Sequence, residues 1–288
     1  MIRLPFILAR GFVASETMDG TMPVLRGLRN NGLLTTVDLL GEHVTSRRLA
    51  NHGRDTYIRL LHALAREDGP NAPDRNISIK LSMIGQLIDE SFCLDNLRQI
   101  LDTAQATQAF VRLDMEGSAI FDSTLRLFET VFPEYREHVG IVLQAYLKRT
   151  HRDIERMCDL QARVRLCKGA YKEPPELAHQ SMEMIRKHYI TYMQMLLTRG
   201  HYPGIATHDD RLLEATRTFA ESEGISRETF EFQMLYRFRP QTQIAIAREG
   251  YNMRVYVPFG RNWLPYYTRR LRERKENIFF VFNTLFRK

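Results

Sequence analysis

A short segment near the end of the chain combines paired arginines with an aromatic ring at helical spacing. Tyr266, Arg269, Arg270 and Glu273 stand at i, i+3, i+4 and i+7, so they share one face of a predicted helix. Burying two adjacent arginines is costly without an anion, and a guanidinium binds a carboxylate through two parallel hydrogen bonds. The segment therefore predicts a carboxylate clamp for a small acid. The alternative is a solvated basic face beside a core tyrosine.

Eight short apolar runs predict the strands that would position this clamp, and the spaces between them each have room for a crossover helix. They are Leu33–Leu40, Asn76–Leu81, Ala109–Glu116, Gly140–Leu147, Arg163–Lys168, Gly204–His208, Thr229–Leu235 and Asn252–Pro258. Helical patterns lie between them, as in Asp122–Phe132, a segment with Thr150 as its expected N-cap, Glu176–Arg199 and the short Gln241–Glu249.

This alternation predicts an α/β fold, a (β/α)8 TIM-like barrel. We expect a single domain over residues 1–288, with its first strand at about 33–40 and its final helix at about 263–275. An open doubly wound sheet is the competing architecture. However, no G-x-G-x-x-G follows the first predicted strand, so the usual nucleotide fingerprint of that fold is missing from the sequence.

Polar side chains recur on the predicted strands after the first one, where a barrel interior usually carries branched apolar residues. They are Lys80, Asp114, Glu116, Gln144, Arg165, Lys168, Thr207, His208, Asp209, Glu231, Gln233 and Tyr256. A single polar residue of this kind usually has a structural partner. Their recurrence predicts an active site at the C-terminal ends of the strands, which we call the mouth of the barrel.

The chemistry of this set favours an anionic substrate or a phosphorylated cofactor. His208 has no histidine partner at metal-ligand spacing, and no G-x-S-x-G nucleophile motif occurs, so we expect no metal site and no serine nucleophile. Asp114 and Glu116, with Glu231 facing them, could form a glycosidase pair. The lysines and arginines among them suit an anion better than a neutral sugar.

The composition is that of a globular protein, with a net charge of +7 and a pI near 9.4. Its basic residues form no long block, so we expect no nucleic-acid partner. Cys93, Cys158 and Cys167 form no C-x-x-C motif, which fits a reducing cytoplasm. We find no signal peptide and no membrane span in the sequence. The apolar stretch Ile278–Phe286 is either a packed final segment or a peripheral contact with the cell membrane.

Eight short motifs occur in the order found in proline dehydrogenases. They are Lys80-Leu-Ser82, Leu113-Asp-Met-Glu116, Leu143-Gln-Ala-Tyr-Leu147, Arg165-Leu-Cys-Lys-Gly-Ala-Tyr171, Ala206-Thr-His208, Phe230-Glu-Phe-Gln-Met-Leu235, Tyr256-Val-Pro258 and Arg269-Arg-Leu-Arg-Glu273. From about Phe12 onward the chain resembles the single-function bacterial form. It is also similar to the proline dehydrogenase domain of bifunctional proline utilisation proteins.

This resemblance implies a barrel with FAD at its mouth, which oxidises L-proline to Δ1-pyrroline-5-carboxylate by hydride transfer to flavin N5. It implies Asp114 and Arg165 as catalytic residues. The implied substrate residues are Lys80, Arg269 and Arg270 at the carboxylate, Leu235, Tyr256 and Tyr266 around the ring, and Glu273 beside the arginines. The implied FAD residues are Met115, Gln144, Arg165, Lys168, Gly169, Ala170, Thr207, His208 and Gln233.

The resemblance further implies electron transfer to a membrane quinone and release of the product to a separate pyrroline-5-carboxylate dehydrogenase. The sequence departs from the family pattern at Arg237, where glycine is usual, at Arg261, and in the loop Glu116–Ile120. Two other classes stay open. One is another anionic-substrate barrel, such as a folate-reducing flavin enzyme or an aldolase with Lys80 or Lys168 as Schiff-base nucleophile. The other is a basic scaffold protein without catalysis.

Overall fold

The computed structural model describes residues 9–264. Tyr266, Arg269, Arg270 and Glu273, most of the final helix expected at about 263–275, and the apolar stretch Ile278–Phe286 lie outside the described residues. The predicted clamp therefore stays a prediction, whereas the barrel that would position it is described.

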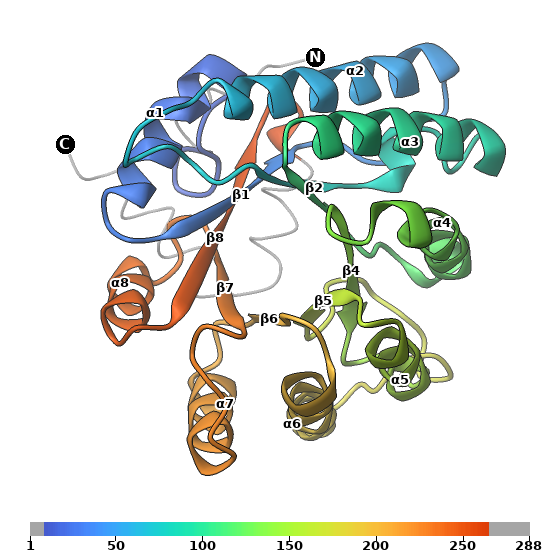
Figure 1. Ribbon diagram of the computed structural model, residues 1–288. Coiled ribbons are helices and arrows are strands. Elements are labelled where there is room, and N and C mark those ends of the chain that lie inside the picture. Colours follow the sequence, from blue (N-terminus) through green and yellow to red (C-terminus); the bar gives the residue numbers. More distant parts are fainter. Residues whose placement is uncertain (1–8, 265–288) are drawn as a thin grey trace.

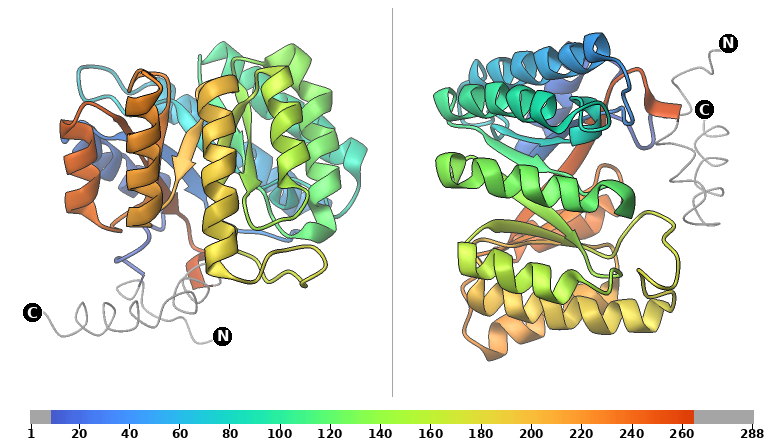
Figure 2. Two further views of the ribbon diagram at one scale, coloured as in Figure 1. Left: turned by 90° about the horizontal axis from the view of Figure 1, so that it is seen from below. Right: turned by 90° about the vertical axis from the view of Figure 1, so that its right-hand side faces the viewer.

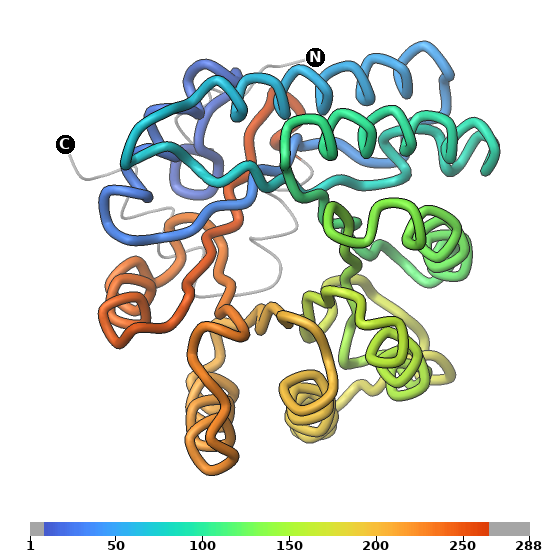
Figure 3. Tube along the Cα trace, in the orientation of Figure 1, coloured from blue at the N-terminus to red at the C-terminus, as the bar shows by residue number. Residues whose placement is uncertain are grey.

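The strands form a closed parallel barrel in the order β1 to β8, as the sequence predicts (Figure 1). Their bounds are β1 Leu34–Leu39, β2 Asn76–Ile79, β3 Phe110–Leu113, β4 Val139–Gln144, β5 Arg163–Cys167, β6 Gly204–Ala206, β7 Glu231–Leu235 and β8 Asn252–Phe259. All the predicted strands are confirmed, with ends that differ by a few residues. β1 pairs with β8 from Leu34↔Arg254 to Leu39↔Phe259, which closes the barrel where the blue and red parts of the chain meet in Figure 3.

Helices surround the barrel on its outside (Figure 2). They are α1 Met18–Arg29, α2 Arg47–Ala65, α3 Glu90–Ala106, α4 Phe121–Tyr135, α5 Thr150–Leu160, α6 Met182–Arg199, α7 Asp210–Ser222 and α8 Pro240–Arg248, with the short 3₁₀ helices η2 Leu81–Met83 and η3 Ser118–Ile120. Together with the strands, these elements give the alternation that the sequence predicts.

Two expected helix starts are wrong. Thr150 is the first residue of α5 and not its N-cap, and its hydroxyl donates to the backbone carbonyl of Gln144 at 2.6 Å. The helix expected from Glu176 begins at Met182, because the preceding residues join the β5–α6 loop (yellow in Figure 2) to the segment after β4. There, Lys148 donates its amide to Leu177 and His179 donates its amide to Tyr146.

The two faces of the strands differ in chemistry because successive side chains point to opposite sides. Apolar residues such as Val37, Ile77, Val111 and Val164 are fully buried among the helices in one continuous core. The alternate positions carry polar residues that bond across the inside of the barrel, and these are Thr36, Asp38, Ser78, Lys80, Arg112, Asp114, Arg165, Glu231, Gln233, Arg254 and Tyr256. The interior is thus a charged network instead of layers of branched apolar side chains.

Candidate active site

Lys80 lies between two carboxylates at the mouth of the barrel. It directly follows β2, and its Nζ lies 2.8 and 2.9 Å from the two carboxylate oxygens of Asp38 in β1. The same Nζ lies 3.9 Å from Oδ2 of Asp114, which directly follows β3. Asp38 and Lys80 are buried, so their charges depend on each other.

Arg165, in β5, connects Asp114 to residues of β2 and β7 on the inside of the barrel. Its Nη1 donates to Asp114 Oδ1 at 2.7 Å, its Nη2 donates to the Ser78 hydroxyl at 3.0 Å, and its Nε donates to Gln233. The hydroxyl of Tyr256 donates to the other Asp114 oxygen at 2.8 Å. These bonds fix the orientation of the Asp114 carboxylate before any ligand binds.

The charges of this site shift the pKa values of its residues. Burial alone would lower the pKa of Lys80, but the Asp38 and Asp114 carboxylates outweigh it and raise that pKa above the usual lysine value. Burial and the Asp114 charge raise the pKa of the Tyr256 phenol. Lys80 is therefore an ammonium ion and Tyr256 a neutral donor. A Schiff-base nucleophile must be a neutral amine, so the aldolase alternative is disfavoured for Lys80.

A second group of charges lies where β5 and β6 end. Asp209 Oδ2 accepts from Lys168 Nζ at 3.0 Å and from Arg186 Nε at 2.8 Å, and Arg186 belongs to α6. The Asp209 amide donates to the Thr207 hydroxyl, and the His208 ring nitrogen Nε2 accepts from the Leu235 amide at 3.0 Å. These bonds bring Lys168, Thr207 and His208 to neighbouring strand ends, as the sequence predicts for barrel residues.

Gly169 makes a tight backbone turn directly after Lys168. Its φ of +123° lies in a region that side chains rarely adopt, and an added Cβ would lie 2.3 Å from Cδ1 of the Tyr146 ring. Ala170 follows and is exposed. The glycine at this turn is therefore required by its close contact with the Tyr146 ring.

The residues after β3 and at the end of β4 form the neighbouring part of the rim. Met115 and Glu116 are buried, and the Gln144 side chain donates to the Glu116 carbonyl at 3.0 Å. Farther along the atypical loop, Ser118 donates its amide to Glu173 in the β5–α6 loop at 2.7 Å. The two loops are therefore tied together across the rim.

The sequence predicts that Glu231 lies at the mouth of the barrel and faces Asp114, and this prediction is wrong. Glu231 is the first residue of β7, so it lies at the N-terminal end of the barrel and not at the mouth. Arg254 Nε donates to it at 2.8 Å, and Arg254 Nη1 reaches the carbonyl of Thr35, the second residue of β1. Burial opposes ionisation of Glu231, but Arg254 outweighs it and lowers the pKa. Glu231 therefore cannot face Asp114 as a glycosidase carboxylate.

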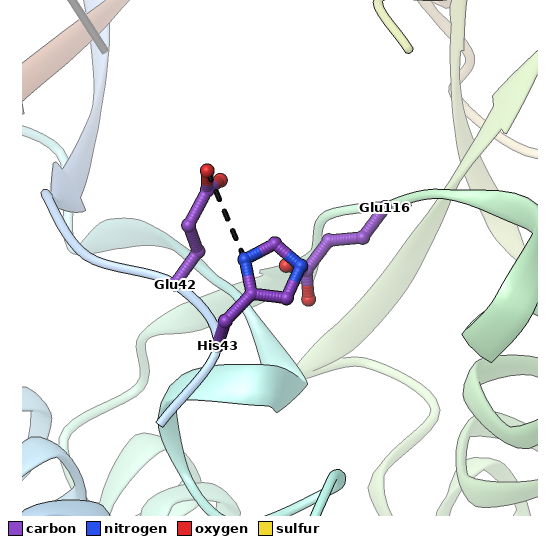
Figure 4. A group of neighbouring side chains, drawn as sticks. All are labelled: Glu42, His43 and Glu116. Carbon is purple, nitrogen blue, oxygen red and sulfur yellow. Dashed lines mark ion pairs between the residues drawn. The ribbon is translucent and has the colours of Figure 1, made fainter. Parts of the chain in front are cut away.

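Glu42, His43 and Glu116 form a group at the rim whose ligand atoms lie within 4.8 Å of one another. Figure 4 shows the His43 ring between the two carboxylates. Glu116 accepts from the Ser82 hydroxyl at 2.7 Å and from the Ser82 amide at 3.3 Å, so hydrogen bonds already stabilise this buried carboxylate. The expectation that the site needs no metal stays a prediction.

Sequence reasoning missed Asp38 and Arg186. Asp38 stands two residues after Thr36 in a strand that was otherwise interpreted as apolar, and the i, i+2 spacing of these two polar residues was the available signal. Arg186 lies in α6 and reaches Asp209 from outside the barrel, so no strand pattern could indicate it.

No helix within residues 9–264 is long and apolar enough to cross a membrane. This finding concerns only that part of the chain.

Comparison with known proteins identifies close relatives of this chain. A family model described as proline dehydrogenase matches residues 22–282. The chain is 38% identical over 282 residues to proline dehydrogenase 2 of Bacillus subtilis (strain 168), covering 98% of this chain and 91% of that protein. It is also 38% identical over 278 residues to proline dehydrogenase of Deinococcus radiodurans, covering 95% of this chain and 88% of that protein.

A solved structure has the same fold. It is the proline utilization A protein of Bdellovibrio bacteriovorus inactivated by N-propargylglycine, with a TM-score of 0.85 and 28% identity. The match covers 92% of this chain and 32% of that one, so this chain spans about a third of the length of the solved protein.

Proposed function

This chain belongs to the proline dehydrogenase family, and on that premise we propose that its barrel mouth binds FAD and oxidises L-proline to Δ1-pyrroline-5-carboxylate. The family makes the protein a flavin oxidoreductase that acts on proline. The finer steps below are our proposals for its residues.

The proline carboxylate binds at Lys80 together with Arg269 and Arg270. A buried ammonium that is already ionised is a suitable partner for a carboxylate. Leu235 is the last residue of β7 and pairs with Tyr256 within β8, and with Tyr266 they form the wall around the proline ring. A rigid wall favours a compact five-membered ring over longer amino acids. Glu273 orients the two arginines by charge pairing.

The side chains and backbone at the mouth fit FAD. The Gly169 turn packs against the Tyr146 ring, and the neighbouring Lys168 ammonium, which is partly exposed, suits a pyrophosphate. The other proposed FAD residues are Met115, Gln144, Arg165, Ala170, Thr207, His208 and Gln233. When bound, the flavin supplies the hydride acceptor, its N5 atom.

Asp114 and Arg165 act as the catalytic pair of this chain. Arg165 keeps a fixed positive charge at the centre of the mouth, where its bonds to Asp114, Ser78 and Gln233 prevent reorientation. Asp114 in turn holds the Tyr256 hydroxyl, so the ring wall and the catalytic charge form one rigid unit. Such preorganised charges cost little reorganisation during a reaction.

The remaining steps follow the family. Electrons pass to a quinone acceptor, with peripheral contact at the inner face of the cell membrane. The oxidation of proline is the first step of proline catabolism to glutamate, and a separate pyrroline-5-carboxylate dehydrogenase consumes its product. We place the whole activity in one domain formed by residues 1–288.

The observation that carries this proposal is the linked set Lys80, Asp114, Arg165 and Tyr256 at the mouth of a chain of this family. The test is an anaerobic visible spectrum of the purified protein before and after addition of L-proline. We expect a flavin spectrum that bleaches with L-proline and not with D-proline or glutamate. A bound flavin that L-proline does not bleach contradicts the substrate. A colourless protein that FAD cannot reconstitute contradicts the cofactor.

A further inference from the structure

Asp38 is a fully buried carboxylate that the proposed mechanism does not yet use. It lies near the end of β1, and both of its oxygens accept from the Lys80 ammonium. Two residues earlier in β1, the Thr36 hydroxyl bonds to Ser78 of β2 at 3.1 Å. Two polar contacts thus join the inner face of β1 to β2 and the residue that follows it, Thr36 to Ser78 and Asp38 to Lys80.

Lys80 has two carboxylates within reach and is bonded to only one of them. Its Nζ is at hydrogen-bond distance from Asp38, whereas the 3.9 Å to Asp114 Oδ2 is too long for a hydrogen bond. That Asp114 oxygen already accepts from Tyr256. An ammonium that moved onto Asp114 would compete with the tyrosine for the same oxygen.

The charges of the site explain why the Asp38 carboxylate determines the position of the Lys80 ammonium. Asp38, Lys80, Asp114 and Arg165 form two ion pairs, Lys80–Asp38 and Arg165–Asp114, linked by the 3.9 Å from Lys80 to Asp114. Burial raises the pKa of the Asp38 carboxyl, and the adjacent Lys80 ammonium opposes this shift. Without the Asp38 charge, Lys80 would have Asp114 as its nearest anion. A buried ammonium is then drawn toward that remaining carboxylate.

We propose that Asp38 is a positioning residue, which holds the Lys80 ammonium away from Asp114 so that Lys80 can bind the substrate carboxylate while Asp114 keeps Arg165 and Tyr256. The role of Lys80 toward the substrate rests on the proposed function. The position of the Lys80 ammonium does not rest on it, and it can be measured without any substrate.

Asp38→Asn is the decisive variant because it removes the charge and keeps the shape. We expect KM for proline to rise about tenfold to a hundredfold, the size typical of a lost charge-assisted carboxylate contact. Asp38→Glu keeps the charge and should restore part of the affinity. Asp153→Asn is the matched control, since Asp153 is also buried and paired with an arginine, Arg149, at 2.8 Å, but lies in α5.

A double-mutant cycle separates positioning from general stability. If Asp38 acts through Lys80, Asp38→Asn should raise KM much less in a Lys80→Met background than in the wild type. Equal increases in both backgrounds would overturn the proposal. The Lys80→Met/Asp38→Asn protein also removes both buried charges together, so it should fold even if Asp38→Asn alone does not.

The second readout is the Nζ resonance of Lys80 in protein labelled with ¹⁵N-lysine, assigned by its loss in Lys80→Met. We expect this resonance to shift in Asp38→Asn and to stay in place in Asp153→Asn. An unchanged Lys80 resonance in Asp38→Asn would overturn the proposal. Failure of the proposed function would instead appear in the wild type, as a flavin that proline does not bleach.

Discussion

Arg165 and Asp114 bond to each other inside the barrel, with 2.7 Å between Nη1 and Oδ1, although they are 51 residues apart in the chain. Arg165 lies in β5 and Asp114 directly follows β3, so β3, β4 and β5 must be paired before the bond can form. The same guanidinium also reaches Ser78 and Gln233. The proposed catalytic pair is therefore fixed by the fold before a ligand arrives.

Removing the Tyr256 hydroxyl should slow the proposed reaction. In Tyr256→Phe, the Asp114 carboxylate loses a donor at 2.8 Å, and a hydrogen bond to a charged group contributes about 1.5–3 kcal/mol. We expect flavin reduction by proline, measured by anaerobic stopped-flow absorbance, to be about tenfold slower or more.

Tyr135→Phe is the control for this variant. Tyr135 in α4 donates its hydroxyl to Asp102 in α3 at 2.6 Å, so the same chemical change is made in the helical shell. Its flavin reduction rate should equal that of the wild type. Equal rates for Tyr256→Phe and the wild type would show that this hydroxyl has no part in the reaction.

Gly169→Ala should weaken flavin binding. The added Cβ would lie 2.3 Å from the Tyr146 ring at a φ of +123°, so the turn must move. We expect a lower flavin-to-protein ratio after purification and a lower melting temperature. Gly224→Ala is the matched control, because Gly224 also has a positive φ, +64°, but a Cβ there meets nothing within 4 Å. If both variants retained flavin equally, the crowding at Tyr146 would be irrelevant to the cofactor.

Protonation of the Asp209 carboxylate should lower the free energy of unfolding of the protein in acid. Burial would raise its pKa, but hydrogen bonds from Arg186 and Lys168 outweigh burial, so the pKa is below the usual value of 3.8. A carboxyl whose pKa is lower in the folded state stabilises above its unfolded pKa, and this contribution is lost as the pH falls through the folded value.

The measurement is the free energy of unfolding of the wild type and Asp209→Asn at pH 7 and at about pH 3, below the unfolded pKa. The difference between the two proteins should be large at pH 7 and shrink in acid. Asp210→Asn removes the neighbouring carboxylate, whose side chain is 78% exposed and pairs with Arg239. Its effect should be small at both pH values, because exposed ion pairs contribute little.

The backbone conformation at position 237 should destabilise the folded protein more with arginine or alanine there than with glycine. The φ of Arg237 is +61°, a left-handed conformation that costs a residue with a Cβ about 1–2 kcal/mol. Arg237→Ala keeps this strain and removes the contact of the guanidinium with Tyr236, whereas Arg237→Gly removes both. In urea denaturation, we expect the glycine variant to be more stable than the alanine variant by about 1 kcal/mol. The reverse order would mean that the strain is relieved elsewhere in the loop.

The barrel could be predicted because its strands carry local signals. The outward-facing residues of each strand are branched and apolar, as with Val111 in β3 and Val164 in β5, and they recur at distances suited to crossover helices. The sequence also indicated that polar residues gather at the mouth. The arginine clamp at Arg269 and Arg270 stays a prediction, since it lies outside the described residues.

The errors arose where the outcome depends on distant residues. The strand expected at Thr229–Leu235 begins at Glu231, so this carboxylate is the first residue of β7 and lies at the N-terminal end of the barrel. Asp38 was missed because its partner Lys80 is 42 residues away, and a strand pattern does not reveal which charges pair. The helix expected at Glu176 starts late because its first residues bond to Tyr146 and Lys148.

The bond from Arg254 in β8 to the carbonyl of Thr35 in β1 spans 219 residues of sequence. Contacts between such distant parts of a chain form slowly, because the entropy of closing a long loop must be overcome first. Until β8 arrives, Glu231 lacks its arginine and the seam beside β1 lacks its partner strand. A nascent chain that has only its first seven strands outside the ribosome would therefore contain the Glu231 carboxylate without Arg254, the counterion that it has when buried in the folded barrel. Pairing of β8 with β1 therefore supplies both the counterion of Glu231 and the last strand of the barrel.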